Sequence, residues 1–137
     1  MVQKSMLTER ALMAMLNAAV DEATRLGQPQ CIVIVDQSAV ELATLRMTGA
    51  KVLSLKSALA KARTAASIGA PSSTIPEHVR PAIAAATEGQ ITGLGGGLPI
   101  VLEGEVVGGV GVGSGSPEQD TAVANAALNA IGAQTFS

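Results

Sequence analysis

The sequence predicts a single α+β domain in which helices pack against an antiparallel sheet. Short apolar segments occur in neighbouring pairs joined by tight turns, which is typical of β-hairpins rather than of strands that alternate singly with helices. Longer segments with apolar residues at helical spacing precede, separate and follow these pairs. With 137 residues the chain has the size of one ordinary domain. We therefore expect residues 1–137 to form one folded unit.

The first helix is predicted between Glu9 and Leu26. Thr8 is a favourable N-cap residue, and Gly27 ends the helical pattern. Apolar residues recur at helical spacing along one face, namely Leu12, Leu16, Ala19, Ala23 and Leu26. Charged residues occupy the other face, so we expect an amphipathic helix with one side packed on the sheet.

The first hairpin follows this helix. Residues 31–35 are β-favouring throughout and predict a strand that is covered on both faces. Residues 36–39 form the expected turn, and residues 40–47 return as the second strand. Helical spacing resumes after Ala50 and ends at Gly69. Because this second helix is small or apolar on nearly every side, we expect it to be buried.

The second hairpin lies in the glycine-rich part of the chain. Its strands are predicted at Leu98–Leu102 and Val106–Val112, joined by a tight turn at residues 103–105. The surrounding glycines have two interpretations: they let a helix pack closely on the sheet, or they let the backbone approach a ligand. A short helix is possible at residues 82–86, and a final helix is expected from Pro117 to Ile131.

The composition excludes several functions. The net charge is −2, and Tyr and Trp are absent, so a nucleic-acid partner is not expected. We find neither a secretory signal nor an apolar run of about 18 residues, so we expect a cytoplasmic protein without a membrane partner. Hydrophobic residues make up 47% of the chain and charged residues 15%, which favours a homo-oligomer. The single cysteine, Cys31, is expected to be buried and inert.

Four motifs, in this order, resemble the GlcG/HbpS family. They are RMTGA from Arg46, ALAKARTAA from Ala58, GGGLPI from Gly95, and the segment from GEVVG at Gly104 to SPEQD at Asp120. The resemblance covers most of the chain and implies a profilin-like α+β fold that assembles into dimers or larger oligomers. It also implies two kinds of function, since some members bind heme and many others belong to small-molecule catabolic pathways. Heme-binding members include an extracellular heme sensor component and the C-terminal domain of PduO-type corrinoid adenosyltransferases.

The residue types that hold metals and heme are scarce. Heme iron takes His, Cys, Met or Tyr as its axial ligand. The chain has one histidine, His78 in a predicted loop, and no tyrosine. No close spacing of zinc ligands is visible, so we expect no metal. We also expect no cofactor, with a heme or tetrapyrrole-binding module as the alternative.

A pocket for a small organic acid is the remaining candidate site. Its candidate catalytic residues are His78 as general acid or base, Glu105 as a second acid or base if buried, and Lys61 as a cation. Arg46 is a candidate for binding a substrate carboxylate through its guanidinium fork. Backbone N–H groups that could donate to a developing oxyanion come from Gly95, Gly96 and Gly97.

Structural roles compete with these assignments. Lys61 can instead cap a carbonyl or pair with Glu105 or Asp120, and Glu105 in a turn is commonly exposed to solvent. Asp120 in the first turn of the last helix interacts favourably with the helix dipole. Our hypothesis is a small-molecule-binding protein of a catabolic pathway, an enzyme that performs cofactor-independent proton transfer of the isomerase, hydratase or lyase type. The alternatives are the heme or tetrapyrrole-binding module and a non-catalytic assembly subunit.

Overall fold

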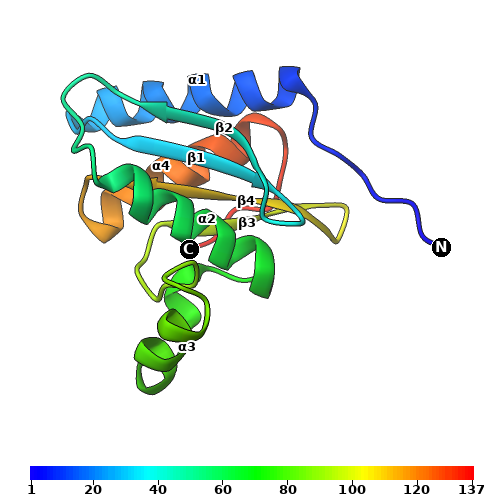
Figure 1. Cartoon of the computed structure of the whole chain (residues 1–137). Coiled ribbons are helices and arrows are strands. Elements are labelled where there is room, and N and C mark those ends of the chain that lie inside the picture. The colour runs from blue at the N-terminus through cyan, green and yellow to red at the C-terminus, as the bar shows by residue number, and fades with distance from the viewer.

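A four-stranded antiparallel sheet forms the centre of the protein (Figure 1), whose computed structural model describes residues 1–137. The strand order is β2-β1-β4-β3, so β1 and β4 are central and their pairing joins the two predicted hairpins. A two-residue turn at Glu103 and Gly104 joins β3 to β4, and both of its residues have positive φ. The strands are β1 (Cys31–Asp36), β2 (Glu41–Arg46), β3 (Gly97–Leu102) and β4 (Glu105–Gly113).

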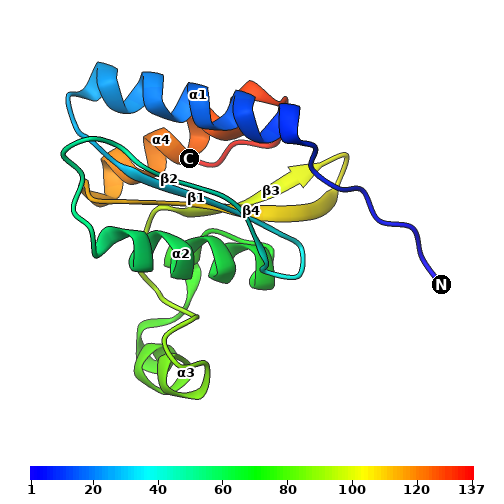
Figure 2. The same cartoon turned by 45° about the horizontal axis from the view of Figure 1, so that its top comes forward.

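Helices cover both faces of the sheet, so the fold has three layers (Figure 2). Helices α1 (Glu9–Leu26) and α4 (Pro117–Ala130) lie on one face, and α2 (Ser54–Ile68) lies on the other. The apolar core is divided accordingly. Ile32 and Ile34 of β1 pack towards α1 and α4, whereas the alternate residues of the same strand pack towards α2. The predicted α+β class and the doubly covered first strand are therefore confirmed.

Local signals set the helix boundaries. The Thr8 hydroxyl accepts a hydrogen bond from the Ala11 N–H at 3.2 Å, and Gly27 ends α1 in the left-handed conformation. Helix α4 begins with a reciprocal capping box between Ser116 and Gln119. Helix α1 has the predicted bounds, and α4 ends one residue earlier than predicted. None of the helices combines the length and apolar character that a membrane crossing requires.

Glycines in β4 let α2 lie directly on the sheet. A Cβ atom added at Gly111 would lie 1.9 Å from the Ala58 carbonyl oxygen, and one added at Gly109 would lie 2.3 Å from that of Ala62. No side chain fits between these backbones. The first interpretation of the glycine-rich segment, close packing of a helix, is therefore correct for β4.

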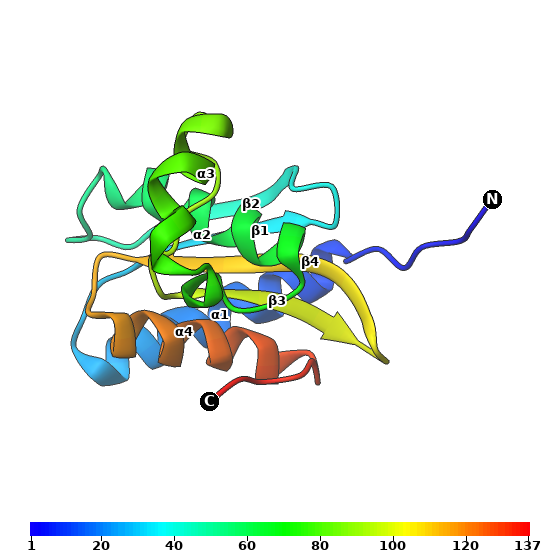
Figure 3. The same cartoon turned by 90° about the horizontal axis from the view of Figure 1, so that it is seen from below.

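The segment between α2 and β3 carries a short helix that projects from the three layers (Figure 3). This segment contains two 3₁₀ turns, η1 (Ser72–Thr74) and η2 (Glu77–Val79), and the short helix α3 (Arg80–Ala86), which begins two residues before the predicted helix. The Arg80 side chain holds the base of the projection by donating to the carbonyl oxygens of Ser73 and Ile75. No residue of η2 or α3 is buried.

Candidate functional site

A buried ion pair lies at one end of the sheet. Lys61 Nζ is 2.9 Å from Asp120 Oδ2 and also donates to the Val112 carbonyl oxygen at 2.8 Å. The other carboxylate oxygen, Oδ1, accepts a hydrogen bond from the Gly115 N–H at 3.0 Å. Both side chains are almost completely buried, with 6% and 3% of their surfaces exposed. The third ammonium proton of Lys61 has no acceptor within the chain.

The two charged residues come from opposite faces of the sheet. Lys61 belongs to α2, and Asp120 to the first turns of α4. They can meet because the chain passes between them at Gly96, which has a φ of 110°. A Cβ atom at Gly96 would lie 2.8 Å from Asp120 Cβ and 3.3 Å from Lys61 Nζ. A glycine is therefore required here for the ion pair to form.

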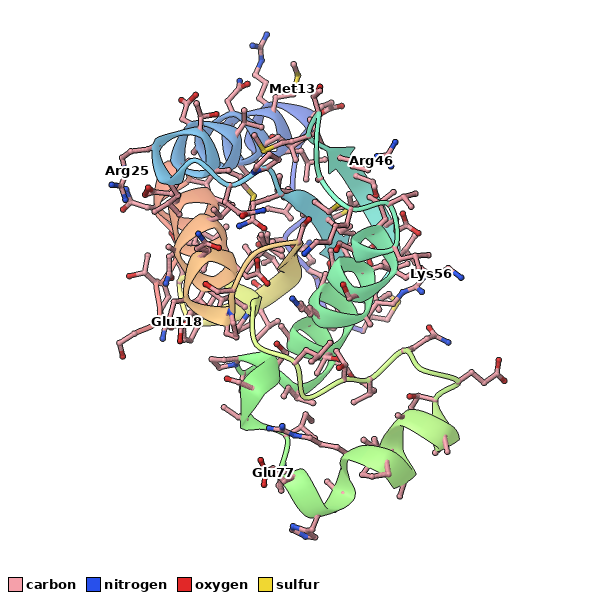
Figure 4. All side chains as sticks on the ribbon, turned by 90° about the vertical axis from the view of Figure 1, so that its left-hand side faces the viewer. Met13, Arg25, Arg46, Lys56, Glu77 and Glu118 are labelled. Carbon is pink, nitrogen blue, oxygen red and sulfur yellow. The ribbon has the colours of Figure 1, made fainter.

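A cavity of about 330 Å³ opens beside this ion pair. We call it the Lys61 pocket; its walls come from residues 51–61, the loop at residues 94–95, and residues 114–120. Figure 4 views α2 and α4 at this end of the protein, where Lys56 and Glu118 point outward on opposite sides. The wall is largely polar, with Leu94 as an exposed apolar side chain at its edge.

The loop between β4 and α4 is held in a strained conformation. Ser114 has a φ of 91°, which is uncommon for a residue with a side chain. Its hydroxyl accepts a hydrogen bond from the Lys51 N–H, and its carbonyl accepts one from the Gln28 side chain, each at 3.0 Å. These contacts fix the pocket wall between α2 and α4.

A buried amide lies against the same loop. Gln30 is fully buried, yet neither its side-chain nitrogen nor its side-chain oxygen has a hydrogen-bond partner. The position that a Cβ atom would take on Gly115 is 2.6 Å from Gln30 Nε2 and 3.0 Å from Asp120 Oδ1. The Gln30 amide therefore adjoins two residues of the pocket wall, Gly115 and Asp120.

Two of the residue positions predicted for the site share this pocket. Lys61 and Gly95 both line it, and Gly96 lies directly behind the ion pair. The Gly97 N–H is already used, because it donates to the Ser72 hydroxyl at 3.0 Å. The alternative in which Lys61 caps a carbonyl and pairs with Asp120 is the observed arrangement.

The other predicted site residues lie elsewhere. His78 is exposed on the projecting segment, and Arg46 is exposed at the end of edge strand β2. Glu105 is exposed at the far end of β4 from the pocket, where its carboxylate accepts hydrogen bonds from the N–H and hydroxyl of Ser5. None of these three lines a cavity together with Lys61.

Lys51 and Ser114 are pocket residues that the sequence did not single out. Lys51 lies just before the start of α2 and belongs to no motif, and the positive φ of Ser114 has no sequence signature outside glycine. Asp120 was one of the two partners expected for Lys61, and the burial of Lys61 in α2 decides that it must have one. A buried lysine requires a partner of opposite charge.

Heme ligands are absent from the cavities. No His, Cys, Met or Tyr side chain lines any cavity of the chain. Cys31 and Met15 are buried in the two halves of the core, whereas His78 and Met13 are exposed. No group of three or more His, Cys, Asp or Glu side chains is placed to hold a metal ion.

A sheet covered on both faces, with a polar pocket beside a buried ion pair at its end, defines the class of the protein as an α+β module with a small polar pocket. The chain belongs to the HbpS-like family. The family model described as "Haem degrading protein HbpS-like" matches residues 7–129. The predicted resemblance is thereby confirmed.

Curated relatives include corrinoid adenosyltransferase PduO. The chain is 33% identical to PduO of Salmonella typhimurium over 123 residues, which are 86% of this chain and 37% of that protein. PduO of Citrobacter freundii is also 33% identical, over 94% of this chain and 40% of its own length. The chain thus spans about two fifths of these relatives. An uncharacterized 15.0 kDa protein of Citrobacter freundii is 33% identical over 93% of both chains.

Solved structures share the whole fold. A PduOC complex with heme superposes with a TM-score of 0.88 at 30% identity, covering 97% of this chain and 100% of that one. The ORFY protein of Klebsiella pneumoniae has the same TM-score and identity, covering 95% and 94%. A double mutant of Streptomyces reticuli HbpS gives 0.85 at 32% identity, covering 96% and 91%.

The expectation that the protein has no cofactor is wrong in light of these structures, because the PduOC structure is a heme complex. The expectation rested on the scarcity of iron-ligand residue types, with His78 as the only histidine and no tyrosine in the chain. Iron coordination itself requires only an accessible axial ligand. A single exposed histidine satisfies that requirement, so the scarcity of ligand residue types does not exclude heme.

Proposed function

We propose that this chain is a heme-binding module and that His78 is the axial ligand of the iron. The observation that carries the proposal is the match to the PduOC heme complex, with a TM-score of 0.88 over 97% of the chain. The family model, whose description refers to haem, supports the same function.

The projecting segment suits a heme ligand. His78 is the only histidine of the chain and is exposed on η2. The residues around it are mostly apolar and none of them is buried: Ile75, Pro76, Val79, Pro81 and Ile83. An accessible imidazole beside uncovered apolar side chains offers an iron ligand and a surface for a flat macrocycle. Bound heme would supply an iron centre.

This segment's own residues fix the backbone that carries His78. Arg80, two residues after His78, donates to the carbonyl oxygens of Ile75 at 2.8 Å and Ser73 at 3.1 Å. These bonds close the base of the projection, so that η2 is fixed relative to η1. Because His78 lies outside the cavities, the heme would bind on the outer surface of the chain.

A hemin titration tests this function. We expect the purified chain to develop a saturable Soret band at one equivalent of hemin, and the variant His78→Ala to lose it. Met13→Leu is the matched control, because Met13 is an exposed residue of another iron-ligand type, on α1, and the variant is expected to keep the band. No band at equimolar hemin would exclude the function, and an unchanged band in His78→Ala would exclude the ligand assignment.

A homo-oligomer in the cytoplasm is part of the proposal. Large hydrophobic side chains are exposed on several elements, and a second copy would cover some of them. They are Met13, Val40, Leu42, Val52, Leu53, Ile68 and Leu94. Light scattering coupled to size-exclusion chromatography measures the mass, and a monomer of 13.7 kDa at all concentrations would contradict an oligomer.

A second candidate is proton-transfer catalysis on a small organic acid of a catabolic pathway. One observation favours it: Lys61 and Gly95 of the predicted site line one pocket. Since His78 and Glu105 lie outside that pocket, Asp120 is the carboxylate that would exchange a proton there. Incubating the protein with small carboxylic acids in D₂O tests it by NMR. Exchange of an α-proton that Lys61→Met abolishes would support catalysis.

A further inference from the structure

We propose that the Lys61 pocket is a binding site for a small monocarboxylate, separate from any heme site. The second candidate function uses the same pocket, and the present proposal names the class of ligand that binds there. It rests on that candidate function only for the location of the pocket. It requires neither a reaction nor His78. The arguments are the charge of the wall, its unused donors, and the unpartnered Gln30 amide.

The pocket carries one uncompensated positive charge. Its charged residues are Lys51, Lys61 and Asp120. Asp120 is already engaged by Lys61 and by the Gly115 N–H. Lys51 forms no ion pair, because the only ion pairs of the chain are Lys61 with Asp120 and Arg25 with Glu22. A single negative charge on a ligand would therefore neutralise the wall.

Unused donors accompany this charge. Lys61 has one ammonium proton without an acceptor, and this nearly buried side chain forms part of the pocket wall. The backbone N–H of Gly95, which lines the pocket, and that of Gly96, which lies behind the ion pair, donate no hydrogen bond within the chain, in contrast to that of Gly97. Successive backbone N–H groups beside a cation bind anionic oxygens well. A carboxylate, with two oxygens that each accept more than one bond, matches this set of donors.

The Gln30 amide points to a ligand independently of the charges. It is fully buried, and both of its polar atoms lack partners within the chain. Buried polar groups are normally hydrogen-bonded. The amide does not itself line the pocket but lies directly behind Gly115 and Asp120 of its wall, so a water ordered there by a bound polar molecule would complete its hydrogen bonding.

The dimensions and polarity restrict the ligand. A cavity of about 330 Å³ lies at the small end of the range of ligand sites, which suits an acid with few carbon atoms. Leu94 is the only large apolar side chain that lines it, which disfavours a tetrapyrrole. A dicarboxylate would bring a second charge for which the wall has no further cation.

Amide NMR of the ¹⁵N-labelled full chain tests the proposal with three probes: propionate, its neutral analogue propionamide, and malonate. We expect propionate to shift the amide signals of Gly95, Gly96 and Gly115 in a saturable way, with propionamide and malonate binding at least tenfold more weakly. Lys51→Gln, which removes one charge-assisted hydrogen bond at an exposed position, is expected to weaken propionate binding about tenfold or more. Lys56→Gln is the matched control, because Lys56 points outward from α2 (Figure 4) and should leave the affinity unchanged.

Three results would overturn the proposal: absence of saturable shifts at these glycines, equal affinity for propionamide, or unchanged affinity in Lys51→Gln. The test is independent of heme, since His78→Ala is expected to retain full propionate affinity. It is also independent of catalysis, since binding is measured without turnover. A failed hemin titration or a failed deuterium exchange would therefore not contradict carboxylate binding. Equally, absence of propionate binding would not contradict the heme function.

Discussion

Lys61 of α2 and Asp120 of α4 reach around the end of the sheet from opposite faces and meet with Nζ and Oδ2 2.9 Å apart. The sheet divides the apolar core into two clusters, one beneath α1 and α4 and the other beneath α2. The ion pair is a direct polar link between the helices of these two layers. It also forms the floor of the polar pocket, so stability and ligand binding depend on the same two residues.

Breaking this pair from one side should be costly. Lys61→Met leaves the Asp120 carboxylate buried without its cation, and we expect a loss of about 3–5 kcal/mol in the free energy of unfolding. The double variant Lys61→Met with Asp120→Leu removes both charges and is expected to recover part of that loss. Urea unfolding followed by circular dichroism measures both. A loss below about 1 kcal/mol in the single variant would contradict a buried, mutually dependent pair.

Two glycines of the same glycine-rich stretch should differ in how much stability an alanine substitution costs. Gly111→Ala forces a Cβ atom to within 1.9 Å of the Ala58 carbonyl oxygen, so we expect a loss of at least about 1–3 kcal/mol or failure to fold. At Gly95 the nearest atoms to an added Cβ are 3.7 Å away, and φ is not positive. Gly95→Ala should therefore change stability by less than about 0.5 kcal/mol. Thermal unfolding of the two variants compares them; equal stability would contradict the close packing of α2 on β4.

The elements could be predicted because their signals are local. Thr8 and Gly27 mark the ends of α1, and Ser116 with Pro117 marks the start of α4. The two roles of the glycines could not be separated in this way. Whether a glycine admits a helix, as Gly111 does, or borders a cavity, as Gly95 does, depends on what lies opposite it in the folded chain.

The site was predictable only in part. Lys61 and Asp120 are 59 residues apart, and their contact follows from the positions of α2 and α4 rather than from spacing. His78, Arg46 and Glu105 have side chains of compatible chemistry, but the fold places each of them on a different exposed surface. Lys51 could not be singled out, since an exposed lysine near a helix start is an ordinary feature of a sequence.

The Cys31 thiol should react slowly with alkylating reagents in the folded protein. It should also make the free energy of unfolding fall at alkaline pH. Burial raises the pKa of this thiol; Arg46 opposes that effect, and Asp120 adds to it. The unfolded chain therefore loses its thiol proton at a lower pH than the folded chain. The contribution to stability is complete below the thiol pKa of the unfolded chain and falls as pH rises above it towards the pKa of the folded chain.

Iodoacetamide labelling and unfolding at two pH values check this prediction. Native protein should react slowly at pH 8 and rapidly in urea. Between pH 7 and pH 10 the wild type should lose more unfolding free energy than Cys31→Ala, which lacks the titrating group. Rapid labelling of the native chain at pH 8 would show that the thiol is accessible and its pKa not raised.

Gln30 should be a position at which stability and binding conflict. Its two buried polar atoms have no partners, and an unsatisfied buried polar group costs about 1–3 kcal/mol. Gln30→Met keeps the length of the side chain and removes both polar atoms, so we expect the variant to be about 1 kcal/mol more stable to urea than the wild type. Gln30→Ala is the control for volume and should be destabilised, because it leaves a cavity beneath Gly115.

If the amide completes its hydrogen bonds with a ligand or with the water that a ligand orders, Gln30→Met should also bind propionate more weakly than the wild type does. A Gln30→Met variant that is less stable than the wild type in the absence of ligand would show that the amide already has partners in the free protein.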